Sequence, residues 1–172
     1  MKIRFYFPKW ETFLEDTKNL PDKVASYDIG HFKMPGLAIP AVSALTPLNH
    51  QVELVDGHMN EINLDDLDFD LAAFSFFTPQ ATAAYQTADY LRAQGKKVVM
   101  GGIHPTLLPE EAAEHADAVC AGMAEHGWTT ILEDFQNNQP RKIYDFRRLE
   151  PDYSIYRLPD RSIWRKKGYV QI

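Results

Sequence analysis

The sequence has 172 residues, of which 45% are hydrophobic and 24% charged, and its 24 acidic and 18 basic residues give a formal net charge of −6. This length predicts one domain, and the negative charge argues against a nucleic-acid partner. The single cysteine, Cys120, excludes an intramolecular disulfide and any multi-cysteine zinc or iron–sulfur site within the chain. The N-terminus lacks the apolar core of a signal peptide, and no stretch approaches the ~20 apolar residues of a membrane span. We therefore expect a cytoplasmic location and no membrane partner.

Short apolar runs along the chain have the character of β-strands. The first, at residues 2–7, is followed by Pro8, which cannot donate to a strand ladder. The run at 70–76 is almost continuously apolar, which is typical of a strand covered on both faces of a parallel sheet. The predicted strands are residues 2–7, 51–56, 70–76, 97–100 and 117–121.

Helical patterns lie between these strands. Apolar residues at near-helical spacing predict a helix over 37–48. Thr78 offers an N-cap hydroxyl before Pro79 at the first helical position, and Gly95 ends that helix. Further helices are predicted from about residue 108 and over 125–135, and residues 11–28 are interpreted as a loop with one short helix.

The alternation of strands and helices predicts an α/β fold. We expect a three-layer, doubly wound sheet of about five parallel strands, flavodoxin-like or Rossmann-like, with strand order 2-1-3-4-5. The pattern ends near Pro140, after which prolines and a basic run at 161–167 follow. Residues 1–140 are therefore interpreted as the α/β domain, and 141–172 as a linker or C-terminal extension without a sixth βα unit.

Ligands of open α/β sheets bind beyond the carboxyl ends of the strands, so the residues there are the candidate site. Gly101 and Gly102 indicate either a close approach to a ligand or a plain tight turn. Residues 75–78 offer two hydroxyls and two aromatic rings, of which at least one ring packs against a helix. His58 and His104 also follow strands, although a single loop histidine is more often a hydrogen-bonding residue.

Several enzyme classes are disfavoured by missing motifs. The chain has no GxGxxG for a dinucleotide, no GxxxxGK[ST] for a P-loop, no GxSxG elbow and no HExxH metal motif. An unrelated flavodoxin-like enzyme that uses Asp56, His58 and His104 stays open as an alternative.

Three segments resemble one known family. The stretch VVMGGIHPTLLPEEAAEHADAVCAGMAEHGW (98–128) resembles the cobalamin-binding domain that precedes the catalytic barrel of cobalamin-dependent radical S-adenosylmethionine enzymes. Segments 34–58 and 74–95 resemble the same family, so the resemblance covers about residues 1–150. It implies cobalamin held over the carboxyl ends of the strands, with its nucleotide tail between the loops. The implied cofactor-binding residues are Pro8, Ser75, Phe76, Phe77, Thr78, Gly101, Gly102, Ile103, His104, Pro105, Thr106, Gly122 and Met123.

The wider cobalamin-binding fold carries a SxL…GG pattern whose serine and glycines line the benzimidazole tail. Ser75 to Phe77 and the pair Gly101–Gly102 match it, with Phe77 in place of leucine. The serine hydroxyl can donate to the one free ring nitrogen of the tail, and the glycines leave room for the ring.

Two positions depart from the family patterns. The DxHxxG motif, which supplies a histidine to cobalt, is absent after the first strand. Asp56-Gly57-His58 imitates its beginning, but it follows the second strand and has Glu61 where glycine is needed. The radical enzymes generally bind cobalamin without this histidine, so we expect no metal ligand from the chain. Met123 stands where the family usually has glutamate, which puts a polar contact in doubt.

The family continues into a barrel whose CxxxCxxC loop holds a 4Fe–4S cluster for S-adenosylmethionine. One cysteine cannot hold that cluster, so the resemblance implies a chain that is not catalytic alone, with the absent barrel as partner in cis or in trans. It would be either a fragment, which we favour, or a stand-alone cobalamin carrier. The alternative is a structural or interaction domain of such an enzyme that has lost cobalamin binding, as Met123 suggests.

Overall fold

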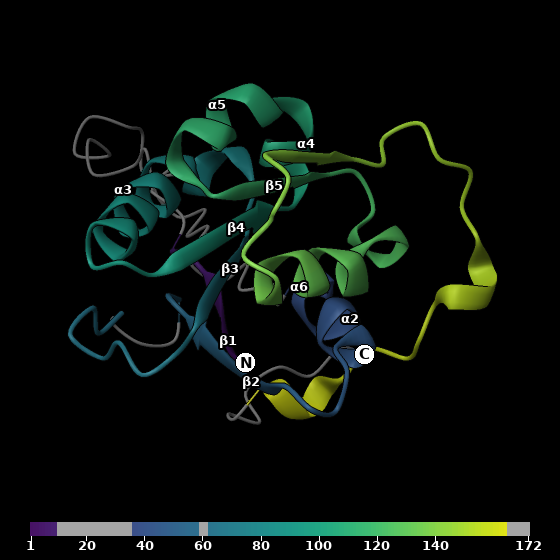
Figure 1. Ribbon diagram of the computed structural model, residues 1–172, viewed down its shortest axis with the longest axis horizontal. Coiled ribbons are helices and arrows are strands. Elements are labelled where there is room, and N and C mark those ends of the chain that lie inside the picture. Colours follow the sequence, from purple (N-terminus) through teal and green to yellow (C-terminus); the bar gives the residue numbers. More distant parts are fainter. Residues whose placement is uncertain (10–35, 59–61, 165–172) are drawn as a thin grey trace, which may run out of the picture.

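The computed structural model describes residues 1–9, 36–58 and 62–164 (Figure 1). Across these residues the chain forms one sheet of order β2-β1-β3-β4-β5-β6, and every neighbouring pair of strands is parallel. The predicted α/β fold class and the order 2-1-3-4-5 are therefore confirmed, while the helix expected within 11–28 lies outside the described residues. The strands are β1 (Lys2–Phe7), β2 (Gln51–Asp56), β3 (Leu71–Ser75), β4 (Lys97–Gly101), β5 (Ala118–Ala121) and β6 (Ile143–Asp145).

The sixth strand, β6, lies in the stretch that the sequence predicted to be an extension. It has three residues and pairs with β5, with Tyr144 opposite Cys120. The Tyr144 hydroxyl donates to Asp134 Oδ2 at 2.7 Å, which fastens the strand to the helix before it. A three-residue strand between charged neighbours has no apolar run of its own, so only its pairing with β5 reveals it.

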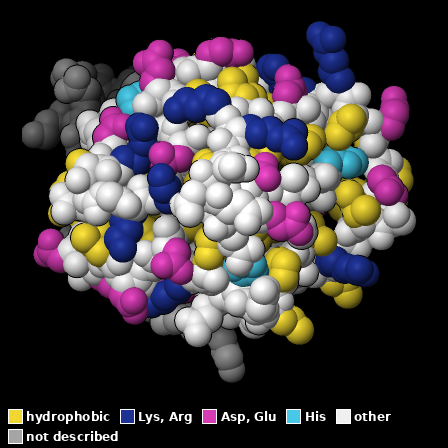
Figure 2. All heavy atoms as spheres, viewed as in Figure 1, with side chains coloured by type: hydrophobic (Ala, Val, Ile, Leu, Met, Phe, Trp, Pro, Cys, Tyr) yellow, Lys and Arg dark blue, Asp and Glu magenta, His cyan; other side chains and the backbone are white. Residues whose placement is uncertain are grey.

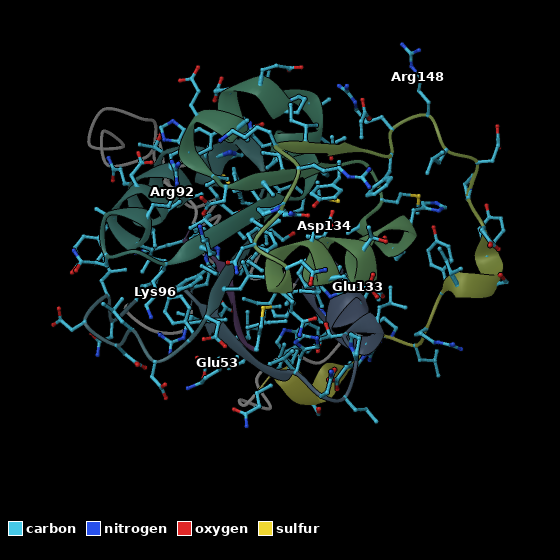
Figure 3. All side chains as sticks on the ribbon, in the orientation of Figure 1. Glu53, Arg92, Lys96, Glu133, Asp134 and Arg148 are labelled. Atoms are coloured by element: carbon cyan, nitrogen blue, oxygen red, sulfur yellow. The ribbon has the colours of Figure 1, made fainter. Side chains whose placement is uncertain are left out.

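Helices cover both faces of the sheet. In Figure 1, α2 and α6 lie on one side, and α3 and α5 on the other. Arg92 on α3 connects the two helices of the second layer, because its guanidinium donates to the Glu114 carbonyl of α5 at 2.9 Å (Figure 3). The helices are α2 (Ala38–Leu45), α3 (Ala81–Ala93), α4 (Ile103–Leu107), α5 (Pro109–His115) and α6 (Trp128–Gln136), with 3-10 turns η3 (Thr78–Gln80), η4 (Ala124–His126), η5 (Tyr153–Ile155) and η6 (Arg161–Ile163).

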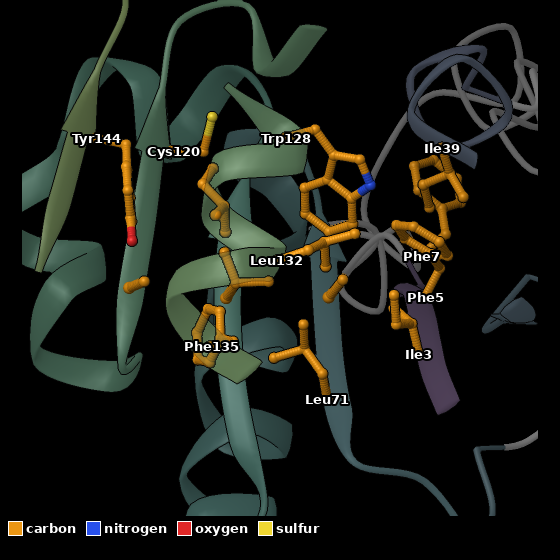
Figure 4. Close-up of a cluster of buried hydrophobic side chains, with 14 of the residues drawn as sticks. Ile3, Phe5, Phe7, Ile39, Leu71, Cys120, Trp128, Leu132, Phe135 and Tyr144 are labelled. Atoms are coloured by element: carbon orange, nitrogen blue, oxygen red, sulfur yellow. The ribbon is translucent and has the colours of Figure 1, made fainter. Parts of the chain in front are cut away.

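Two hydrophobic cores result from the alternation of side chains along each strand. Phe5, Ala73 and Val99 face α2 and α6, in the cluster that Figure 4 shows. Tyr6, Phe74 and Met100 face α3 and α5. Each fully buried valine, phenylalanine or methionine side chain stabilises the fold by about 1.5–3 kcal/mol, so both layers are held firmly on the central strands.

The structure corrects one predicted helix start and adds one helix. Thr78 does not cap the helix that follows: its hydroxyl pairs with His104, and Gln80 Oε1 accepts the Phe77 N–H at 2.9 Å instead. The one-turn helix α4 was not predicted, because its sequence, IHPTL, is too short to show a period. Gly95 does end α3, with φ at +78°.

The surface carries charged side chains of both signs, and the helices are short. On the face shown in Figure 2, basic and acidic side chains are interspersed. Among the described residues, each helix is too short or too polar to cross a membrane.

Candidate functional site

A cavity of about 130 Å³ lies at the carboxyl edge of the sheet, between the strands and helices α2 and α6. Its floor comes from one face of neighbouring strands, where Phe5 pairs with Ala73, Ala73 with Val99, and Ser75 with Gly101. Its roof comes from Ile39 and Val42 of α2 and from Trp128 of α6. The remaining lining residues are Ala38, Phe74, Met100, Gly102, Cys120, Gly122, Met123, Ala124 and Glu125.

Most of the cavity wall is apolar, and its polar groups are few. The Trp128 indole N–H is already used, because it donates to Thr46 Oγ1 at 2.8 Å. Within the described part of the chain, the Ser75 hydroxyl makes no hydrogen bond, although it lies beside the glycine turn after β4. Ser75 can therefore offer a hydrogen bond to a ligand without giving one up.

Gly102 and Gly122 are required by the backbone. Both have φ at +99°, which L side chains rarely adopt. A Cβ at Gly102 would lie 2.7 Å from the backbone of Phe76, and one at Gly122 would lie 2.7 Å from the backbone of Phe146. The tight-turn interpretation therefore accounts for Gly102.

Thr106 ties these two turns together. Its hydroxyl donates to the Gly102 carbonyl at 2.7 Å and accepts the Gly122 N–H at 3.0 Å. The rims of the cavity after β4 and after β5 are therefore held at a fixed separation.

Gly101 has a different reason to be glycine. Its φ is not positive, and a Cβ there would meet only ordinary contacts, 3.6 Å from the Cys120 carbonyl and 3.8 Å from the Cys120 Cβ. The fold does not demand glycine at 101, and its missing side chain leaves the middle of the cavity floor open.

His104 lies in the opposite layer, away from this cavity. The residue is 4% exposed, and its ring packs on Phe76 and has both nitrogens in hydrogen-bond contact. Nδ1 lies 3.1 Å from Thr78 Oγ1, and Nε2 lies 3.0 Å from the Tyr85 hydroxyl and 3.3 Å from Glu111 Oε1. Burial, and next the neighbouring Glu111 carboxylate, raise the pKa of Tyr85, which keeps its hydroxyl protonated as a donor in this cluster.

The other predicted site residues divide between the two layers and the rim. Pro8 is buried, and its carbonyl accepts from Gln80 Nε2. Phe77 packs against the core beneath α2 and α6, whereas Phe76 is buried in the other core. Pro105 is buried on α4. The structure thus brings together Ser75, Gly101, Gly102, Gly122 and Met123 around the cavity.

The rim beside the cavity exposes apolar side chains. Ile103 is 54% exposed on α4, Leu107 follows it one turn later, and Met123 is exposed after β5. Met123 also accepts a hydrogen bond from the Tyr156 hydroxyl to its Sδ at 3.3 Å.

The Asp56-Gly57-His58 segment begins at the last residue of β2 and does not line the cavity. The His58 N–H donates to Asp56 Oδ1 at 2.9 Å, and the His58 ring lies against Phe7. Among the described residues, no group of three or more His, Cys, Asp or Glu side chains could hold a metal ion.

Sequence reasoning missed most of the cavity wall. Ile39 and Val42 come from α2, while Glu125 and Trp128 come from the segment after β5. Trp128 ends the stretch on which the family resemblance rests, but periodicity marks it only as buried. Which layer a buried side chain joins depends on the crossover that brings its helix to the sheet.

Comparison with known proteins gives one family. The family model of the B12 binding domain matches residues 32–139. The chain is 43% identical over 120 residues to bacteriochlorophyllide d C-8(2)-methyltransferase of Chlorobaculum tepidum, an alignment that covers 69% of this chain and 26% of that protein. It is 32% identical over 125 residues to bacteriochlorophyllide d C-12(1)-methyltransferase of the same organism, covering 72% of this chain and 27% of that protein.

The chain therefore spans about a quarter of the length of these curated relatives. Among solved structures, the N-terminal domain of a hypothetical protein of Thermotoga maritima matches with a TM-score of 0.40 and 21% identity, over 50% of this chain and 73% of that one.

Proposed function

The chain belongs to the B12-binding domain family, and on that premise we propose that it is a cobalamin-binding module. It holds the corrin ring at the carboxyl edge of the sheet and the nucleotide tail in the cavity beneath α2 and α6. The observation that carries this proposal is the apolar cavity with the unengaged Ser75 hydroxyl beside the bare floor at Gly101.

The residues of the cavity fit the tail of cobalamin. Its base is a flat, largely apolar ring with one ring nitrogen free when it leaves the cobalt. An apolar cavity of roughly 150 Å³ is known to admit benzene, so a cavity of about 130 Å³ that also opens to solvent offers room for an aromatic ring. Ser75 would donate to the ring nitrogen, while Phe5, Val99 and Trp128 would enclose the faces of the ring.

The exposed apolar rim fits the corrin. Met123 lines the cavity, Ile103 and Leu107 lie on α4 directly after the Gly102 turn, and all three side chains are exposed, so they are available to contact an apolar macrocycle. A bound macrocycle would bury these side chains, and each Å² of apolar surface removed from water would favour binding by about 25 cal/mol.

We expect neither His104 nor His58 to bind the cobalt. His104 is buried in the opposite layer with both nitrogens engaged, and His58 lies in the turn after β2. The spectrum of the bound cofactor should therefore show no coordination by either of these imidazoles.

Cobalamin supplies the ability to carry a methyl group. Both curated relatives are named methyltransferases, and we propose that this chain serves methyl transfer together with a radical S-adenosylmethionine domain, in cis or in trans. Its one cysteine is buried, so the 4Fe–4S cluster and S-adenosylmethionine would be held by that other domain, and this chain alone would not be catalytic.

The test is a titration of the purified chain with hydroxocobalamin, followed by visible absorbance and calorimetry. Saturable one-to-one binding without a histidine-coordinated spectrum would support the proposal. Absence of binding at high micromolar cobalamin would contradict it.

The second candidate function is a structural or interaction domain that has lost cobalamin. The observation that favours it is Met123 at the place of the usual glutamate. If the wild-type chain does not bind and Met123→Glu does, this second candidate is the correct one.

A further inference from the structure

We propose that the cavity selects the lower base of the corrinoid, accepting a benzimidazole and rejecting a purine. This inference rests on the proposed function, because it concerns the same cavity. It adds which class of corrinoid the chain binds and which residues of the cavity wall determine that selectivity.

The first argument is the chemistry of the deep wall. Phe5, Ala73, Val99, Ile39 and Trp128 present carbon to the cavity, and all of them are buried. A base that enters between the sheet and the helices therefore meets aliphatic and aromatic side chains on both faces.

The second argument is the small number of available polar partners. The Trp128 N–H is used by Thr46, and burial raises the pKa of the Cys120 thiol to about 12, so that this group stays neutral and bonds weakly. Ser75 remains as the hydroxyl with no partner among the described residues. One hydroxyl matches one free ring nitrogen.

Glu125 is the charged residue of the lining, and it also borders the neighbouring groove formed with Thr129 and Arg157. Its carboxylate acts electrostatically on the Cys120 thiol and could accept at most the exocyclic amine of a purine, because a carboxylate has no proton to donate to the ring nitrogens.

A purine base brings more polar groups than this cavity can satisfy. Adenine as a lower base carries two further ring nitrogens and an exocyclic amine beyond the nitrogen that Ser75 can serve. A buried polar group without a partner is costly, and each lowers affinity by roughly tenfold or more. Dimethylbenzimidazole replaces those groups with carbon, which the wall accepts.

The experiment compares three probes on the wild-type chain by calorimetry and visible absorbance: cobalamin, the analogue with adenine as lower base, and cobinamide, which lacks the tail. We expect cobalamin to bind at least tenfold more tightly than the adenine analogue, and the adenine analogue to bind within threefold of cobinamide.

Two results would overturn the inference while leaving the proposed function intact. One is an adenine analogue that binds within threefold of cobalamin, and the other is a cobinamide that binds as tightly as cobalamin. Failure of all three probes to bind would instead remove the proposed function.

A pair of variants tests the wall itself. Ala73→Ser adds a hydroxyl inside the cavity, and Ala72→Ser adds one on the other face of the same strand, where the residue is equally buried. Both carry the cost of a buried hydroxyl, but only Ala73→Ser should narrow the ratio between cobalamin and the adenine analogue, by about threefold or more. Thermal unfolding establishes that each variant folds, and an unchanged ratio in a folded Ala73→Ser chain would contradict the inference.

Discussion

Three glycines at the carboxyl edge of the sheet have different physical reasons to be glycine. Gly102 and Gly122 have positive φ and lie against backbone atoms, so the turns depend on them. Gly101 has neither constraint, and its missing Cβ only enlarges the cavity. Substitution at 101 should therefore affect binding, and substitution at 102 should affect folding.

Gly101→Ala should weaken cobalamin binding by about tenfold, because overfilling a packed site costs about 1–3 kcal/mol. Stability should change little, since the new methyl meets only ordinary contacts. The matched control is Gly36→Ala, whose methyl would lie 3.5 Å from the Phe7 ring and outside the cavity lining. Calorimetric titration of both variants checks this, and equal affinities in the two would contradict it.

Gly102→Ala should lower the free energy of unfolding by about 1–3 kcal/mol or more, because the residue is held at φ +99° with backbone 2.7 Å from the added methyl. Urea unfolding followed by circular dichroism measures the change. A midpoint equal to that of Gly101→Ala would argue against the assigned strain.

Cys120 reports on the cavity, because its thiol lines it and the chain has no other cysteine. Burial raises its pKa to about 12, so the reactive thiolate is scarce at pH 8 and grows only as the pH rises toward that value. Labelling of the native chain by a thiol reagent should be slow at pH 8.

Saturating cobalamin should slow the labelling of Cys120 further, and cobinamide should not. An unchanged rate with cobalamin would mean that the tail does not enter.

At the scale of elements, His104 links three helical segments. It bonds Thr78 of η3, Tyr85 of α3 and Glu111 of α5, while sitting on α4 itself. A helix of five residues is unstable alone, so α4 depends on such contacts to present Ile103 and Leu107 at the rim.

His104→Ala should cost about 2–4 kcal/mol of unfolding free energy, since it leaves a cavity and removes the hydrogen bonds of the ring to Thr78 and Tyr85. Cobalamin binding should weaken while the visible spectrum of the bound cofactor stays unchanged. His115→Ala is the control. His115 bonds Asp89 at 2.8 Å from a partly exposed position, so this substitution should lower the free energy of unfolding by less. A spectral change in His104→Ala would identify a cobalt ligand and contradict the positioning role.

At the scale of the whole molecule, the α2–α6 core extends past residue 140. Tyr144 of β6 is 3% exposed and Ile163 of η6 is 7% exposed, both in the same cluster as Phe5 and Trp128. Burial of these two side chains contributes about 1.5–3 kcal/mol each. The boundary at residue 140 stays a prediction, and this packing leads us to expect that the folded unit needs more of the chain.

A chain ending at residue 140 should be less stable than one ending at 164 by several kcal/mol, because it loses both side chains and leaves the edge of β5 unpaired. Thermal and urea unfolding of the two chains measure the difference. Equal stability would support the boundary at 140.

The sequence by itself determined the fold class, the order of the first five strands and the family. These depend on local signals, because apolar runs, helical spacing and turn residues are readable along the chain. It also placed Ser75, Gly101 and Gly122 at strand ends, since strand ends follow from strand boundaries.

Only the tertiary structure decided which of these residues share a cavity. Ser75 ends β3 and His104 follows the neighbouring strand β4, yet they face opposite layers, because the turn at Gly102 and the pairing with β3 set the direction of each side chain. Trp128 reaches the cavity only because the crossover after β5 lays α6 beside α2. Strand β6 likewise forms only because it pairs with β5. Side-chain direction, layer and edge pairing depend on contacts between distant segments, and those contacts leave no period in the sequence.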